Sequence, residues 1–148
     1  MTKPDDHRGV AGMLCFSLYS ASHAFTPLYR PLLDKLGLTY PQYLIMVSLW
    51  NRDGQNVKEL GNDLFLDSST LTPLLKRLNV AGLITRTRNP KDEREVLLHL
   101  TEKGRALQGQ ADDVMHCIGD AVALEADALD TLRVTIDGLR NRLQARAR

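Results

Sequence analysis

The sequence contains few of the residues that define several large classes of protein. Only two of its 148 residues are cysteine, Cys15 and Cys117, with no Cys-x-x-Cys pair and no histidine at ligand spacing. A disulfide scaffold is therefore excluded, and we expect neither a metal site nor a bound cofactor. Aromatic residues make up only 5%, which is too few for a protein that stacks the bases of single-stranded nucleic acid.

Long apolar segments are also missing. No run approaches the roughly 18–20 residues that are needed to span a bilayer. Residues 1–8 are polar, predict a short frayed leader, and contain no apolar core of a signal peptide. We therefore expect a cytoplasmic protein that does not enter a membrane. Its length, with 43% hydrophobic and 25% charged residues, predicts one globular domain over residues 1–148.

The net charge is only +1, but the charged residues are unevenly distributed along the chain. Residues 76–105 hold eight Lys or Arg against four Asp or Glu, whereas residues 106–137 hold seven acidic residues and one basic residue. The last eleven residues then carry four arginines. Such blocks of like charge indicate that the basic stretch and the C-terminal part have different functions.

The centre of the chain has the pattern of two short helices joined by a tight connection. Asn56 is a candidate N-cap with Glu59 three residues further on, and Asp67 opens the second helix after a short Phe65-Leu66 connection. The second helix carries an apolar stripe of Leu71, Leu74, Leu75 and Leu78. Its other faces hold the candidate DNA-contacting residues Ser68, Ser69, Thr70, Thr72, Lys76 and Arg77. An ordinary amphipathic helix with a solvated face would show the same pattern.

The residues that follow favour DNA binding. Residues 83–88 and 93–100 read as two strands around a turn at 89–92, and a hairpin directly after such a helix pair is the wing of a winged helix. Basic residues on a hairpin suit the narrow, electronegative minor groove of DNA. The candidate wing contacts are Arg86, Lys91, Asp92 and Arg94.

Long amphipathic helices are predicted on both sides of this unit. The first is predicted from Val10 to residue 36. Pro27 and Pro31 lie inside it and predict a kink or a break near Thr26. A shorter helix opens with a Thr39/Gln42 capping box, and two helices follow Thr101. The predicted fold is mainly α with a small β-wing: a winged helix-turn-helix over residues 39–104, between dimerisation helices at approximately 1–38 and 105–148.

Three runs of sequence, at residues 66–78, 89–94 and 100–104, resemble the MarR family of transcriptional regulators. The N-terminal half resembles its OhrR-type branch, the organic-hydroperoxide sensors, and the likeness covers nearly the whole chain, weakening after about Gly104. The resemblance implies a homodimer that binds double-stranded operator DNA, and no enzyme. It also implies that Asp92 and Arg94 form a pair that holds the wing arginine for DNA contact.

The same resemblance assigns the cysteines. The residue matching Cys15 is the sensor in OhrR-type proteins, and tyrosines matching Tyr19, Tyr29 and Tyr40 surround it. Some members carry a second cysteine in the C-terminal region that forms a disulfide across the dimer, a position that Cys117 could fill, while others use small thiols. From the residues alone, a free cysteine in an apolar helix is usually inert core filling, although the neighbouring tyrosines argue against that here. The alternative for the tyrosines is interface packing.

The predicted function is a repressor that binds operator DNA when reduced and is released when an organic hydroperoxide oxidises Cys15. Hydrogen bonds from phenol hydroxyls favour the thiolate of a cysteine over its thiol. The thiolate is the form that reacts with a peroxide. A repressor that responds to a phenolic or lipophilic ligand, with the cysteines incidental, is the alternative within the fold. A thiol peroxidase using Cys15 and Cys117 is disfavoured because nothing in the sequence resembles a reductase-docking site.

Overall fold

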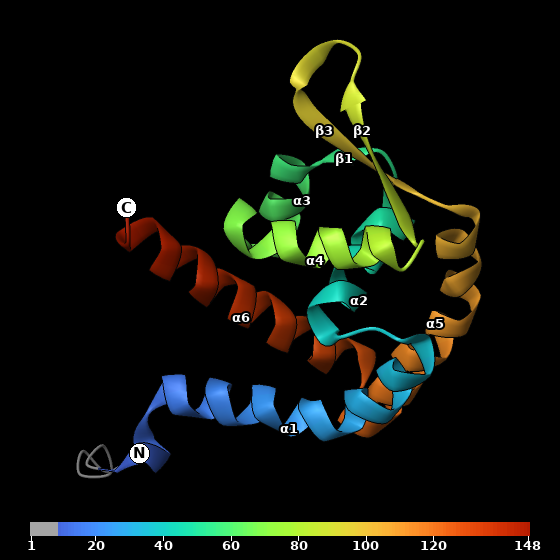
Figure 1. Cartoon of the computed structure of the whole chain (residues 1–148). Coiled ribbons are helices and arrows are strands. Elements are labelled where there is room, and N and C mark those ends of the chain that lie inside the picture. Colours follow the sequence, from blue (N-terminus) through green and yellow to red (C-terminus); the bar gives the residue numbers. More distant parts are fainter. Residues whose placement is uncertain (1–8) are drawn as a thin grey trace. The chain divides into compact units, whose positions relative to one another are not determined.

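The computed structural model describes residues 9–148, so the leader predicted for residues 1–8 lies outside the described residues. The chain divides into a first unit that ends at Val114 and a second unit, Met115–Arg148. It is mainly helical with one small antiparallel sheet, as predicted (Figure 1). None of the helices in the described part of the chain is long and apolar enough to cross a membrane. The single-domain organisation stays a prediction.

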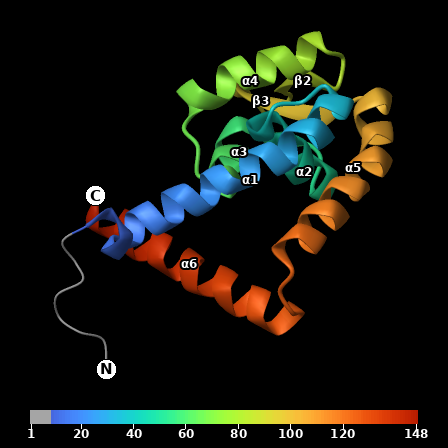
Figure 2. The ribbon, with the colours of Figure 1, turned by 90° about the horizontal axis from the view of Figure 1, so that it is seen from below.

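Helix α1 (Leu14–Leu36) follows a short 3-10 turn, η1 (Val10–Gly12), and continues through both internal prolines. Figure 2 shows it as one unbroken ribbon up to its junction with the next helix. The predicted break near Thr26 is therefore wrong, whereas the kink, its alternative, stays a prediction. The packing of Tyr29 and Leu33 against the following helix holds the second half of α1 in place, and this tertiary packing outweighs the hydrogen bonds lost at the prolines.

Helix α2 (Tyr40–Asn51) begins with the predicted capping box. The backbone N–H of Gln42 donates to Thr39 Oγ1 at 3.4 Å, and the backbone N–H of Thr39 donates to Gln42 Oε1 at 2.9 Å. The buried side chains of α2 include Tyr43, Ile45, Met46 and Leu49. Because these positions cover more than one face, α2 is the central helix of the first unit, as its apolar sequence predicts.

Helices α3 (Val57–Leu64) and α4 (Ser68–Val80) form the predicted helix-turn-helix. The capping box between Asn56 and Glu59 is present, and Asp67 Oδ1 accepts a hydrogen bond from the Thr70 backbone N–H at 2.8 Å. The turn between them requires Phe65 to adopt a left-handed conformation, φ 55°. Both predicted helix starts are confirmed.

The same turn brings the backbone close to Gly61. A Cβ atom at this position would lie 2.6 Å from the carbonyl oxygen of Leu66, a contact that side chains do not tolerate. We expect Gly61→Ala to lower the free energy of unfolding by about 1–3 kcal/mol, as overpacking does. Gly109→Ala is the matched control, because nothing lies within 4 Å of the added atom, and it should stabilise helix α5 by up to about 1 kcal/mol. Equal urea midpoints for Gly61→Ala and the wild type would contradict the close approach.

The sheet contains β1 (Gln55–Asn56), β2 (Ile84–Asn89) and β3 (Asp92–Leu100) in the order β1-β3-β2, all antiparallel. Strands β2 and β3 are the two predicted strands of the wing, and their hairpin projects at the top of Figure 1. The register pairs Ile84 with Leu100 and is shifted at Arg88/Asn89 near the tip. Strand β1 is not predicted from the sequence.

Helix α5 (Glu102–Val122) begins at the end of β3, and hydrogen bonds attach this junction to the rest of the winged helix. Trp50 Nε1 donates to the Gly104 carbonyl at 2.9 Å, and Thr101 Oγ1 donates to the Gly82 carbonyl at 2.6 Å. Asp53 accepts from the Leu100 backbone N–H at 2.8 Å and from the Arg105 guanidinium at 2.6 Å. The second unit holds the rest of α5 and helix α6 (Ala126–Arg146).

Candidate functional site

The exposed side of α4 carries the six residues predicted to contact DNA. Their side chains are exposed: Ser68, Ser69, Thr70, Thr72, Lys76 and Arg77. On the opposite side, Leu71, Leu75 and Leu78 are 1% exposed, whereas Leu74 is only partly buried. The helix therefore separates into a core face and a polar face as predicted, with Leu74 at the border; DNA contact itself stays a prediction.

Hydrogen bonds within the first turn of α4 fix its polar groups. Ser69 Oγ donates to Asp67 Oδ1 at 2.7 Å, and Thr72 Oγ1 donates to the Ser68 carbonyl at 2.7 Å. The Ser69 hydroxyl and the Thr70 backbone N–H lower the pKa of the Asp67 carboxyl below its ordinary value. Because both hydroxyl protons are used inside the protein, Ser69 and Thr72 present acceptor lone pairs to solvent.

The wing contains the predicted acid–arginine pair. Arg94 Nε lies 3.2 Å from Asp92 Oδ1, which also accepts the Arg94 backbone N–H at 3.1 Å. The Arg94 side chain is 92% exposed, so the pair contributes little to stability and mainly fixes the direction of the guanidinium. Arg86 and Lys91 are exposed on the same hairpin.

Glu95 braces the wing, and sequence reasoning missed it. Its carboxylate accepts from Asn89 Nδ2 at 2.9 Å, near the tip, and from Asn56 Nδ2 at 3.3 Å, at the start of α3. Asn56 is 39 residues away in the sequence, so no local pattern reports the contact. Through these two hydrogen bonds, Glu95 connects the hairpin to the N-terminus of α3 in the helix-turn-helix.

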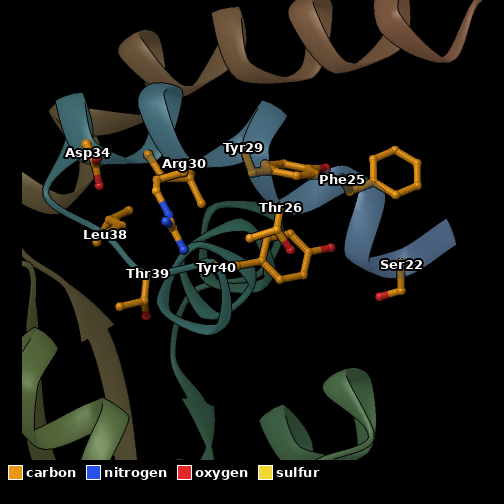
Figure 3. Close-up of a pocket in the computed structure, with 10 residues that line it drawn as sticks. Ser22, Phe25, Thr26, Tyr29, Arg30, Asp34, Leu38, Thr39 and Tyr40 are labelled. Carbon is orange, nitrogen blue, oxygen red and sulfur yellow. The ribbon is translucent and has the colours of Figure 1, made fainter. Parts of the chain in front are cut away.

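A cavity of about 430 Å³ lies between the second half of α1 and the start of α2 (Figure 3). Tyr29 and Tyr40 meet in it, with ring centroids 4.8 Å apart. Burial raises the pKa of Tyr29 to about 12, helped by Tyr40 and Tyr43 nearby and by a hydrogen bond with Tyr40. The Tyr29 hydroxyl is therefore protonated at physiological pH, and within the single chain its hydrogen bond is to Tyr40. The lining residues are Ser22, Phe25, Thr26, Tyr29, Arg30, Leu33, Asp34, Leu38, Thr39 and Tyr40.

The two cysteines and Tyr19 lie outside this cavity. Cys15 is exposed near the start of α1, and Cys117 is exposed in the second unit. Tyr19 is 61% exposed, and its ring packs on His23 with centroids 4.3 Å apart. Across residues 9–148, neither cysteine is bonded to the other and no group of three or more His, Cys, Asp or Glu could hold a metal ion.

Helix geometry separates Cys15 from the tyrosines of its own chain. Cys15 and Tyr29 are fourteen residues apart on the uninterrupted helix α1, which corresponds to about 21 Å along its axis. Tyr40 lies beside Tyr29 and is equally remote. The structure thus brings Tyr29 and Tyr40 together, but it does not bring either of them to Cys15 within one chain.

A helix-turn-helix followed by a two-stranded wing defines a DNA-binding transcription regulator of the winged-helix class. The family described as transcriptional regulator SarA/Rot matches residues 27–110. The chain belongs to the MarR-type family of winged-helix transcriptional regulators. Within it, the sequence is of the OhrR type.

Two relatives support this placement. The chain is 51% identical to the organic hydroperoxide resistance transcriptional regulator of Bacillus subtilis, over 74% of each protein. It is 46% identical to the HTH-type transcriptional regulator TtmR of Methylorubrum extorquens, over 99% of this chain and 75% of that protein.

Among solved structures, reduced AbfR bound to DNA is similar, with a TM-score of 0.74, 34% identity, and coverage of 90% of this chain and 94% of that one. AbfR, from Staphylococcus epidermidis, is also known in a disulfide form, to which this chain is similar with a TM-score of 0.62, 33% identity, and coverage of 92% and 90%.

Proposed function

We propose that this regulator is a homodimeric repressor that binds operator DNA when Cys15 is reduced and releases it when an organic hydroperoxide oxidises Cys15. The observation that carries the proposal is the Tyr29–Tyr40 pair, which lines a cavity whose wall is partly apolar, with Phe25, Leu33 and Leu38. The similarity to the Bacillus subtilis organic hydroperoxide regulator supports the same assignment. The winged helix supplies the DNA-binding half of the function.

A second copy of the chain is needed to cover α1. Large apolar side chains are exposed along this helix and the turn before it: Val10, Met13, Leu14, Phe16, Phe25 and Leu28. Exposed large apolar side chains gathered along one segment in this way mark a protein interface. A two-fold dimer through α1 also gives two recognition helices, which matches a pseudo-palindromic operator with half-sites about 34–36 Å apart.

The dimer also completes the redox site. Because Cys15 is about 21 Å from Tyr29 along one helix, and Tyr40 lies beside Tyr29, these two tyrosines can reach the thiol only from the other copy. In the proposed site, Cys15 of one protomer enters the cavity of its partner. There the hydroxyls of Tyr29 and Tyr40 turn from each other to donate hydrogen bonds to the sulfur, which favours the thiolate.

The reaction at this site is a two-electron transfer from sulfur to peroxide. The Cys15 thiolate attacks one peroxide oxygen, an S–O bond forms, and the O–O bond breaks. The alkoxide that leaves accepts a proton and departs as an alcohol, and a tyrosine hydroxyl is placed to stabilise its charge. The resulting sulfenic acid condenses with a thiol, that of Cys117 or of a small molecule, to give a disulfide and water.

A ligand-gated repressor remains the second candidate, and the cavity itself favours it. A volume of about 430 Å³ lies within the range that small-molecule sites occupy, roughly 300–1,000 Å³. In that case a bound lipophilic or phenolic molecule would release DNA without any chemistry at sulfur.

DNA binding before and after peroxide tests the proposal. An operator fragment is first selected from random duplexes with the reduced protein, and its binding is followed by fluorescence anisotropy. One equivalent of cumene hydroperoxide per subunit should release the DNA, and a thiol reductant should restore binding. Oxidised protein that keeps its full affinity would refute the proposed function.

A mixed dimer tests whether the site is shared between protomers. One chain carries Cys15→Ser, the other carries Tyr29→Phe and Tyr40→Phe, and two affinity tags isolate the heterodimer. A shared site pairs the remaining Cys15 with intact tyrosines, so we expect that thiol to be oxidised at the wild-type rate. The control is the homodimer in which both chains carry Tyr29→Phe and Tyr40→Phe. Its Cys15 thiols should be oxidised about tenfold more slowly, because fewer of them are ionised. A heterodimer as slow as this control would show that each site belongs to one chain.

A further inference from the structure

The pairing of the two wing strands is interrupted just below the tip of the hairpin. The register passes from the Arg88–Val96 pair directly to the Asn89–Asp92 pair, so residues 93–95 of the described hairpin have no partner residue in β2. The tip, which is the part beyond this irregularity, carries the acid–arginine pair and projects past β1 and α3 (Figure 1). Because the regular ladder ends below the tip, other contacts fix the direction in which it points.

Three polar side chains connect the tip to α3 through a continuous series of hydrogen bonds. The Glu95 carboxylate accepts from Asn89 Nδ2 at 2.9 Å and from Asn56 Nδ2 at 3.3 Å. The oxygen of each amide is also occupied. Asn56 Oδ1 accepts from the Glu59 backbone N–H at 2.8 Å, and Asn89 Oδ1 accepts from the Lys91 backbone N–H at 3.0 Å. We call Asn56, Glu95 and Asn89 the wing brace.

The donors and acceptors of the wing brace match in one arrangement. Both amide oxygens accept backbone N–H groups, so each amide turns its NH2 group toward Glu95, and a carboxylate offers one oxygen to each. All three side chains are partly buried, where a polar group without its partner is costly. The charge of Glu95 alone would disfavour binding of the hairpin to DNA, because phosphates repel a carboxylate.

We propose that Glu95 is a positioning residue for DNA binding. Through the wing brace it holds the tip against the helix-turn-helix, so that Arg94 meets the minor groove while α4 occupies the major groove. The inference rests on the operator binding in the proposed function and needs no chemistry at Cys15. It also predicts a sign: removal of this acid weakens DNA binding, whereas charge alone predicts tighter binding.

Glu95→Gln should weaken operator binding about tenfold, the scale of one lost hydrogen bond to a charged group. Glutamine has the same size, but its amide sets an N–H donor against one of the two asparagine donors and releases the tip. The reduced protein is titrated into an operator fragment selected from random duplexes, with anisotropy as the readout. The slope of log affinity against log salt should fall by about one, because the Arg94 contact is lost.

Glu93→Gln is the matched control. Glu93 is an exposed acid of the same strand, and its side chain lies outside the wing brace. This variant loses the same charge, so its affinity for the operator should be unchanged or slightly higher. A lower urea midpoint of Glu95→Gln with an unchanged affinity and salt slope would give Glu95 a structural role alone and overturn the proposal.

An exchange of charge within the wing brace separates hydrogen bonding from net charge. In the double variant Asn89→Asp with Glu95→Gln, the new carboxylate can accept from the glutamine amide and from the Lys91 backbone N–H. The glutamine oxygen can then accept from Asn56, and the net charge equals that of the wild type. We expect its affinity within about twofold of the wild type. Asn89→Asp alone sets two carboxylates against each other and should weaken binding about tenfold.

The last measurement repeats Glu95→Gln in a chain that already carries Lys91→Ala and Arg94→Ala. If Glu95 acts through the tip, it should change the affinity of this chain less than about twofold. A tenfold loss there, or tighter binding of Glu95→Gln in the otherwise wild-type chain, would overturn the positioning role. A wild type that binds no duplex would refute this inference together with the proposed function. Failure of peroxide to release the operator would refute the redox function alone.

Discussion

Cys15→Ser should abolish the release of DNA by organic hydroperoxide, even at a large excess of oxidant, and leave the affinity of the reduced protein unchanged. A serine hydroxyl does not ionise near neutral pH and forms no sulfenic acid, so the first chemical step is lost. Cys15 is exposed in the single chain, and serine is nearly the same size, so the fold should not change. Anisotropy titrations of operator DNA with and without cumene hydroperoxide measure both quantities.

Cys117→Ser provides the comparison. If Cys117 is the resolving thiol, this variant should still lose DNA but accumulate sulfinic acid, which a thiol reductant does not restore. The wild type should instead return to full binding after reduction. A Cys15→Ser protein that is still released by the hydroperoxide would support the ligand-gated alternative, in which the cavity and not the sulfur receives the signal.

Arg94→Ala should weaken DNA binding by about 1–3 kcal/mol, roughly fivefold to 150-fold, and lower the slope of log affinity against log salt by about one. Asp92→Ala should also weaken binding, although it removes a negative charge from a DNA-facing hairpin. The reason is the contact of 3.2 Å between Asp92 Oδ1 and Arg94 Nε, which orients the guanidinium.

Glu93→Ala is the control for that argument. Glu93 is an exposed acid of the same strand, and no ion pair joins its carboxylate to Arg94 among the described residues. Its removal should leave DNA binding unchanged or tighten it slightly, since only a repulsive charge is lost. If Asp92→Ala tightens binding as Glu93→Ala does, the pairing has no role in DNA contact.

The sequence predicts the helix-turn-helix well because the signals are local. Each capping box needs two residues three positions apart, and Asn56 with Glu59 meets that condition without help from the rest of the chain. Strand β1 is missed because it has two residues and pairs with Leu97 and Leu98, about forty positions away. Glu95 is missed for the same reason.

The expected break in α1 shows how tertiary contacts override a local rule. The cost of a proline inside a helix is real, but the packing of Tyr29 and Leu33 on α2 keeps the helix intact. That continuity also changes the interpretation of the candidate site. Cys15, Tyr19 and Tyr29 are close in sequence, which suggests one cluster in one chain, yet a continuous helix spreads them along about 21 Å.

The attachment of α5 to the winged helix has a mechanical consequence. Trp50, Asp53 and Thr101 fix the start of α5 to the base of the wing, so a tilt of this helix turns the wing and α4 with it. The segment of α5 within the first unit, residues 102–114, is about 20 Å long. A tilt of about 10° at one end displaces the other by about 3.5 Å, which is close to the rise of one base pair along B-DNA. A small change in the angle of α5 is therefore converted into a much larger displacement at the far end of this segment.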